Sequence, residues 1–100
     1  MAADPYVIQV PPVIAPLVPE YLRNREKDVE TMQALLAAGD LAQLRRLGHN
    51  LRGSAGAYGV PPLSVLGGRI EDAALASDLA AIGTALEELR AFLRTVKLAP

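Results

Sequence analysis

The chain has 100 residues, a formal net charge of −1 at pH 7 and no cysteine. This length suits one domain with a single hydrophobic core and leaves no room for a separate cofactor-binding domain. The near-neutral charge argues against a nucleic-acid-binding or polybasic membrane protein, and the lack of cysteine excludes disulfide bonds and thiol chemistry.

Residues 1–12 are predicted to form an extended N-terminal arm, because several prolines in this range disfavour regular structure. Residues 13–17 are predicted to form a short helical turn whose apolar side chains pack on the rest of the protein. Prolines also interrupt the apolar stretch 7–18, so it cannot form a membrane-spanning helix, and the start lacks the basic region of a signal peptide. We therefore expect a cytoplasmic protein that does not bind membranes.

Four longer segments follow, each with apolar residues at spacings of three and four that are typical of amphipathic helices. The first is predicted over residues 19–38 and the second over residues 40–58, with an aspartate as its N-cap. The third begins at Pro61, a residue suited to a first helical turn. The fourth follows a cap at Ser77 or Asp78.

Because the connections between these segments are only a few residues long, successive helices are expected to be antiparallel neighbours. The predicted fold is therefore all-α, an antiparallel up-down-up-down four-helix bundle over residues 13–100 that follows the N-terminal arm. The apolar stripe of the fourth helix resembles a zipper, but at this length the core of a monomeric bundle explains it better. Gly67 and Gly68 lie inside the third helix and are expected to weaken it.

Charge is unevenly distributed along the chain. The charged residues between positions 41 and 70 are all arginines, namely Arg45, Arg46, Arg52 and Arg69. The acidic residues all lie before or after this stretch. A locally basic surface on a nearly neutral protein suits a small anionic group or an acidic site on a partner.

His49, the only histidine, lies in the second predicted helix. At about 100° per residue, His49 projects about 130° from the centre of the apolar side of this helix, so we expect its ring to face solvent. The residues at helical spacing from His49 share its face, and they are Arg45, Arg46, Arg52, Gly53 and Gly56. A glycine inside a helix costs about 1 kcal/mol relative to alanine, so two on an exposed face indicate close approach by another molecule.

This combination of residues favours phosphoryl chemistry. A neutral imidazole nitrogen is a good nucleophile, and a phosphoryl group on His49 would lie within reach of the Arg52 guanidinium one turn away. The sequence has no P-loop, no kinase glycine-rich loop and no carboxylate cluster suited to a metal. We therefore expect another protein to supply the phosphoryl group, and this chain to be a phosphocarrier without an ATP site, a metal or a cofactor of its own.

The stretch from His49 to Gly59, HNLRGSAGAYG, closely resembles the motif of histidine phosphotransfer (HPt) domains. In that motif a histidine, an apolar residue, a lysine or arginine, a glycine and a serine follow in order. The similarity continues at the spacing of the family through Leu63, Leu66, Ile70, Glu71 and Asp78. Arg52 stands where lysine is commoner in the family, and Gly48 stands where alanine is usual.

The resemblance implies that His49 is phosphorylated, that Arg52 stabilises the phosphate, and that Gly59 ends the helix. The expected partner-docking residues are Arg45, Arg46, Gly53 and Gly56. The chain would accept a phosphoryl group from a receiver-domain aspartate in a two-component phosphorelay and pass it to another receiver. Its partners would be the receiver domains of response regulators and hybrid histidine kinases, and Mg²⁺ is expected in the receiver.

Other interpretations remain open on the sequence alone. A docking or inhibitory module would bind receiver domains or a histidine kinase without being phosphorylated. A hydrolase or metalloenzyme is disfavoured, because the chain has one histidine, no cysteine and no convincing acidic partner for that histidine. The arginines around His49 also fit an ordinary solvated helix face, and Gly53 and Gly56 also fit the close packing of a neighbouring helix.

Overall fold

The structure is a computed structural model that describes residues 7–98. This range contains four long helices, which are α1 (Val18–Ala38), α2 (Leu41–Ala57), α3 (Pro61–Leu75) and α4 (Leu79–Thr95). Each long helix predicted from the sequence is present, and the prediction of an all-α helical bundle is confirmed. None of the helices within residues 7–98 is long and apolar enough to cross a membrane.

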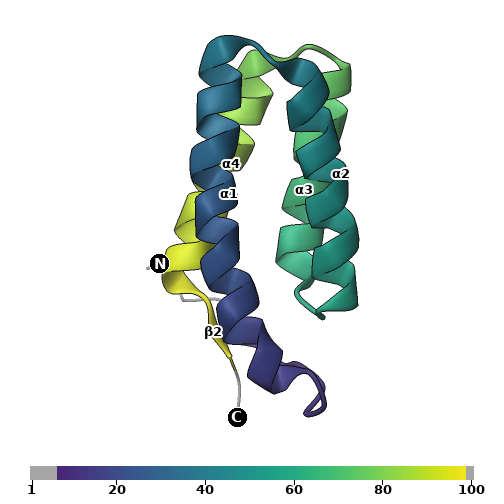
Figure 1. The fold of residues 1–100 in the computed structure, drawn as a ribbon, viewed down its shortest axis with the longest axis vertical. Helices are drawn as coiled ribbons and strands as arrows, with labels where there is room; N and C mark the ends of the chain where they lie inside the picture. The colour runs from purple at the N-terminus through teal and green to yellow at the C-terminus, as the bar shows by residue number, and fades with distance from the viewer. Residues whose placement is uncertain (1–6, 99–100) are drawn as a thin grey trace, which may run out of the picture.

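The helices are arranged as two neighbouring pairs. Figure 1 shows α1 beside α4 and α2 beside α3, with consecutive helices running in opposite directions. Around the bundle, each helix contacts the one before it and the one after it, and α4 closes the ring against α1. The contact of α2 with α3 is the most extensive, so α3 is the helix that determines the surroundings of α2.

Local sequence determines where the helices begin and end. The carboxylates of Asp40 and Asp78 accept hydrogen bonds of 3.1 and 3.0 Å from backbone N–H groups three residues further on, which makes them the N-caps of α2 and α4. Gly39 ends α1, and Gly59 follows α2; both have a φ of 72°. Glycine adopts this left-handed conformation without a Cβ clash, so both helices stop there and the chain reverses.

Apolar side chains at helical spacing fill the interior of the bundle. The largest fully buried ones are Phe92, Met32, Leu44, Leu63, Ile70, Ile82, Leu86, Leu89, Val18 and Val60. Leu79, which begins the apolar stripe predicted for the fourth helix, is 50% exposed, because it is the first residue of α4. The core therefore follows the predicted periodicity except at a helix end.

The N-terminal and C-terminal ends of the described chain lie together. β1 (Val7–Ile8) pairs in parallel with β2 (Lys97–Leu98), and Ile8 is buried. No strand was expected here, because a strand of two residues is too short to show an alternating sequence pattern. Residues 1–6 of the expected arm lie outside the described residues.

A single 3-10 turn, Ala15–Leu17, precedes α1 at the position where a short helical turn was predicted. Val13 and Leu17 are 83% and 56% exposed, so the prediction that they pack on the bundle was wrong. Val18, which follows this turn and belongs to the same predicted apolar group, is fully buried, so the prediction is confirmed at that residue. A single turn presents only part of its circumference to the core, and the buried apolar side chain here is that of Val18, the first residue of α1.

Candidate functional site

His49 lies in the middle of α2 on the side that faces solvent. Its side chain is 70% exposed, which confirms the orientation expected from the helical wheel. The opposite side of the helix carries Leu44, Leu51 and Ala55, all buried in the core. The imidazole is therefore accessible to another protein, while the helix that carries it is anchored by packing.

Glu71 of α3 is the acidic partner of His49. Its Oε2 lies 3.0 Å from Nδ1 of His49, and the glutamate side chain is only 14% exposed. A carboxylate can only accept a hydrogen bond, so Nδ1 carries a proton and donates a hydrogen bond to Glu71. In the neutral ring the lone pair is then on Nε2. The sequence-based statement that His49 lacks a convincing acidic partner was therefore wrong.

The contact between His49 and Glu71 depends on a close crossing of α2 and α3 at two glycines. A Cβ on Gly67 would lie 2.5 Å from the backbone nitrogen of Arg52 and 2.8 Å from the carbonyl oxygen of Gly48. A Cβ on Gly48 would lie 2.8 Å from the backbone nitrogen of Glu71. Any larger residue at these two positions would separate the helices and move Glu71 away from the imidazole.

Arg52 lies one turn after His49, as the sequence predicts, and it also faces Glu71. Its Nη1 is 3.6 Å from Oε1 of Glu71, and its side chain is 60% exposed. The Arg52 side chain passes over Gly68, where an added Cβ would contact its Cδ at 3.5 Å. One carboxylate oxygen of Glu71 therefore interacts with His49, and the other lies near Arg52.

Gly53 and Gly56 lie on the exposed side of α2 after His49. A Cβ at either position would meet nothing within 4 Å, so no neighbouring helix of the described chain requires glycine there. This observation removes one of the open interpretations, the close packing of a helix against these glycines. What remains is an exposed stretch of helix without side chains near the imidazole, which a partner can approach closely.

Arg45 and Arg46 lie one turn before His49, and both are exposed. Together with Ala42, His49 and Glu71 they line a surface hollow of about 310 Å³. Arg46 donates a hydrogen bond to the side-chain oxygen of Gln43. The structure thus brings all the candidate residues from the sequence to one surface of α2, and it adds Glu71 from α3.

Sequence reasoning also missed the aromatic contact that holds the C-terminal end of α2 against α1. The rings of Tyr21 and Tyr58 stack with centroids 4.2 Å apart, and the Arg25 guanidinium lies 4.4 Å from the centre of the Tyr21 ring. The hydroxyl groups of Tyr21 and Ser54 share a hydrogen bond of 2.6 Å. This contact fixes α2 on the side away from α3, which helps to keep the His49 surface in place.

The sequence model of the Hpt domain matches residues 17–98 of the chain, a range that contains all four helices and the His49 site. The chain therefore belongs to the Hpt domain family. No curated protein and no solved structure gives a significant match to it. Membership of the family implies a part in histidine phosphotransfer in two-component systems, through interaction with receiver domains or kinases, and Hpt domains act there as phosphocarriers.

Proposed function

We propose that the chain accepts a phosphoryl group on Nε2 of His49 from the aspartyl phosphate of one receiver domain and delivers it to an aspartate of another. The orientation of the imidazole carries this proposal. Its side chain is 70% exposed, while Glu71 holds Nδ1 at 3.0 Å. One ring nitrogen is thus fixed by the protein itself, and the other is available to a partner.

In the accepting step, the lone pair of Nε2 attacks phosphorus as the P–O bond to the receiver aspartate breaks, and the aspartate leaves as a carboxylate. The new N–P bond makes the ring more positive. Nδ1 keeps its proton, and the carboxylate of Glu71, which accepts that hydrogen bond, offsets the added positive charge. No proton has to be transferred, and the reverse step returns the lone pair to Nε2.

The surface around His49 supports the approach of a folded partner. Gly53 and Gly56 present no side chain, and Arg45 and Arg46 present positive charge to the acidic site that a receiver uses for phosphoryl transfer. We propose that the partners are receiver domains of response regulators and hybrid histidine kinases, and that a monomer of this chain docks them. Mg²⁺ would be bound by the receiver, so the chain would need no ATP site, metal or cofactor of its own.

Incubation with a phosphorylated receiver domain and Mg²⁺ tests the proposal. We expect label on the wild-type chain that is labile in acid and stable in alkali, as a phosphohistidine is. His49→Gln should take up no label, while circular dichroism shows unchanged helix content, because the ring is exposed and fills no core space. Labelling of the variant at the wild-type level would reject the proposal.

The same experiment separates the carrier from a docking or inhibitory module. A chain that binds receiver domains with measurable affinity but gains no label would be such a module. The accessible Nε2 and the hydrogen bond from Nδ1 to Glu71 favour the carrier, since a module that only docks does not need an oriented imidazole.

A further inference from the structure

We infer that the surface between α1 and α4 is a second docking site, which binds an amphipathic helix of a partner protein. A hollow of about 380 Å³ lies there, and we call it the α1–α4 groove. All the residues that line it belong to α1 or α4, so it includes neither His49 nor any other residue of the phosphotransfer site. The inference therefore goes beyond the proposed function and does not rest on it.

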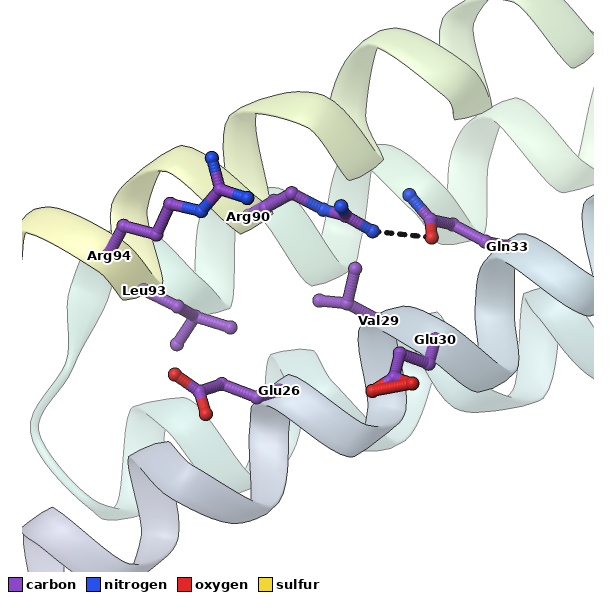
Figure 2. Close-up of a pocket in the computed structure, with 7 residues that line it drawn as sticks. All are labelled: Glu26, Val29, Glu30, Gln33, Arg90, Leu93 and Arg94. Atoms are coloured by element: carbon purple, nitrogen blue, oxygen red, sulfur yellow. Dashed lines mark hydrogen bonds between the residues drawn. The ribbon is translucent and has the colours of Figure 1, made fainter.

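The two walls of the α1–α4 groove carry opposite charges. Figure 2 shows Glu26 and Glu30 of α1 on one side of the groove and Arg90 and Arg94 of α4 on the other. The residues of each pair are four positions apart, so each wall presents two like charges one helical turn apart. The groove thus has an acidic wall and a basic wall that run alongside each other.

The floor of the groove is apolar and one of its ends is closed. Val29 is buried and Leu93 is partly buried, and both lie between the charged side chains in Figure 2. Arg90 donates a hydrogen bond of 2.5 Å to Gln33, which links the two helices at the closed end. The wall from Glu26 to Gln33 is about 11 Å long, which is about two turns of helix.

The charges on the walls are not paired within the fold. In the part of the chain that the structure describes, the side chains of Glu26, Glu30 and Arg94 make no hydrogen bond or ion pair. The neighbouring boundary between α3 and α4 is different, because Arg69 and Glu88 form an ion pair across it. No such pair spans the α1–α4 groove, so the charges of both walls are available to a partner.

An amphipathic helix matches this surface. Its apolar row would cover the floor, basic residues four positions apart would pair with the acidic wall, and acidic residues at the same spacing would pair with the basic wall. A small ion matches it poorly, because each wall repels the ion that the other attracts. The hollow at His49 is lined only by residues of α2 and α3, so the chain can bind this helix and a receiver at once.

Binding of two synthetic peptides, measured by fluorescence anisotropy, tests the inference. Both are covalently stapled, because short isolated helices are marginal in water, and both carry a central row of leucines. The mixed peptide has lysines on one flank and glutamates on the other, and the acidic peptide has glutamates on both flanks. We expect wild type to bind the mixed peptide about tenfold more tightly than the acidic one, and the difference to shrink at high salt.

Glu26→Lys/Glu30→Lys should reverse this preference, because it makes both walls basic. We expect the variant to bind the acidic peptide about tenfold more tightly than the mixed one. A misfolded chain would lose affinity for both peptides and would not exchange one for the other. The matched control is Glu20→Lys/Asp72→Lys, which makes the same change in net charge at exposed positions outside the groove and should keep the wild-type preference.

Two further measurements locate the bound peptide. In nuclear magnetic resonance spectra, the mixed peptide should shift the backbone amide signals of residues 26–33 and 90–94 and leave those around His49 unchanged. With the groove saturated by this peptide, a phosphorylated receiver should label His49 at the rate seen without peptide. Slower labelling would show that the two surfaces overlap, and the inference of a separate docking site would be wrong.

Other outcomes also overturn the inference while the proposed function stands. One is equal affinity of wild type for the two peptides, and another is failure of Glu26→Lys/Glu30→Lys to reverse the preference. A third is self-association of wild type that this variant abolishes in analytical ultracentrifugation, since the groove would then be an interface between copies of the chain. Absence of label on His49 both with and without peptide would contradict the proposed function instead.

Discussion

The two sides of α2 use the same residue type for opposite reasons. Toward α3, Gly48 and Gly67 are required because a Cβ on either would lie under 3.0 Å from backbone atoms of the other helix. On the exposed side, a Cβ on Gly53 or Gly56 would meet nothing within 4 Å, so the fold itself does not require glycine there. The first pair is explained by folding, and the second pair is left to be explained by a partner.

The comparison also shows how the site is assembled. Gly48 and Gly67, where α2 faces α3, bring the two backbones so near that Glu71 can reach His49 and hold one nitrogen of its ring. Gly53 and Gly56, on the exposed side of α2, keep the surface near His49 free for a partner that approaches Nε2. His49 lies at the boundary between the two sides, which is why it is both oriented and accessible.

Gly67→Ala should have the largest effect, because the added methyl group would lie 2.5 Å from a backbone nitrogen that cannot move independently of α2. We expect the free energy of unfolding to fall by about 3 kcal/mol. Urea denaturation followed by circular dichroism measures this change. Gly68→Ala is the matched control, since its Cβ would meet the Arg52 side chain at an ordinary 3.5 Å and alanine favours the helix. Equal stability of the two variants would show that the crossing is looser than the structure describes.

The sequence predicted the helices well because their signals are local. Asp40 and Asp78 cap helices at the expected places, and the apolar periodicity of α2 correctly placed His49 in solvent. These features depend on residues that are within a few positions of one another in the chain. Helix formation and the direction of a side chain can therefore be inferred without knowledge of the tertiary structure.

The features that the sequence did not predict depend on contacts between distant residues. Gly67 was expected only to weaken α3, yet it allows the closest approach of α3 to α2. Glu71 was not recognised as the partner of His49, because the two residues are 22 positions apart. One signal was available, since Glu71 follows Gly67 by one helical turn and lies on the same side of α3. The register between the two helices is needed to interpret it.

Gly53→Phe tests whether a partner docks on the exposed side of α2. The fold has space for the ring, so we expect the free energy of unfolding to change by less than about 1 kcal/mol. The affinity for a receiver domain should fall by about tenfold or more, because the ring occupies the surface next to His49. Isothermal titration calorimetry measures the affinity. Ala91→Phe, which adds the same bulk to an exposed position of α4, should bind as wild type. If both variants bind equally well, the receiver docks elsewhere.

Gly53→Ala and Gly56→Ala should change the free energy of unfolding less than Gly67→Ala does, and with the opposite sign. Nothing lies within 4 Å of either added methyl group, so only the helix propensity changes, and alanine is favoured over glycine in a helix by about 1 kcal/mol. We expect each variant to unfold at a higher urea concentration than wild type. A loss of stability would mean that these glycines do serve the fold. A gain in stability together with slower phosphoryl transfer would show that α2 gives up helix stability at these positions to let a partner approach His49, the situation expected of glycines that are retained for binding.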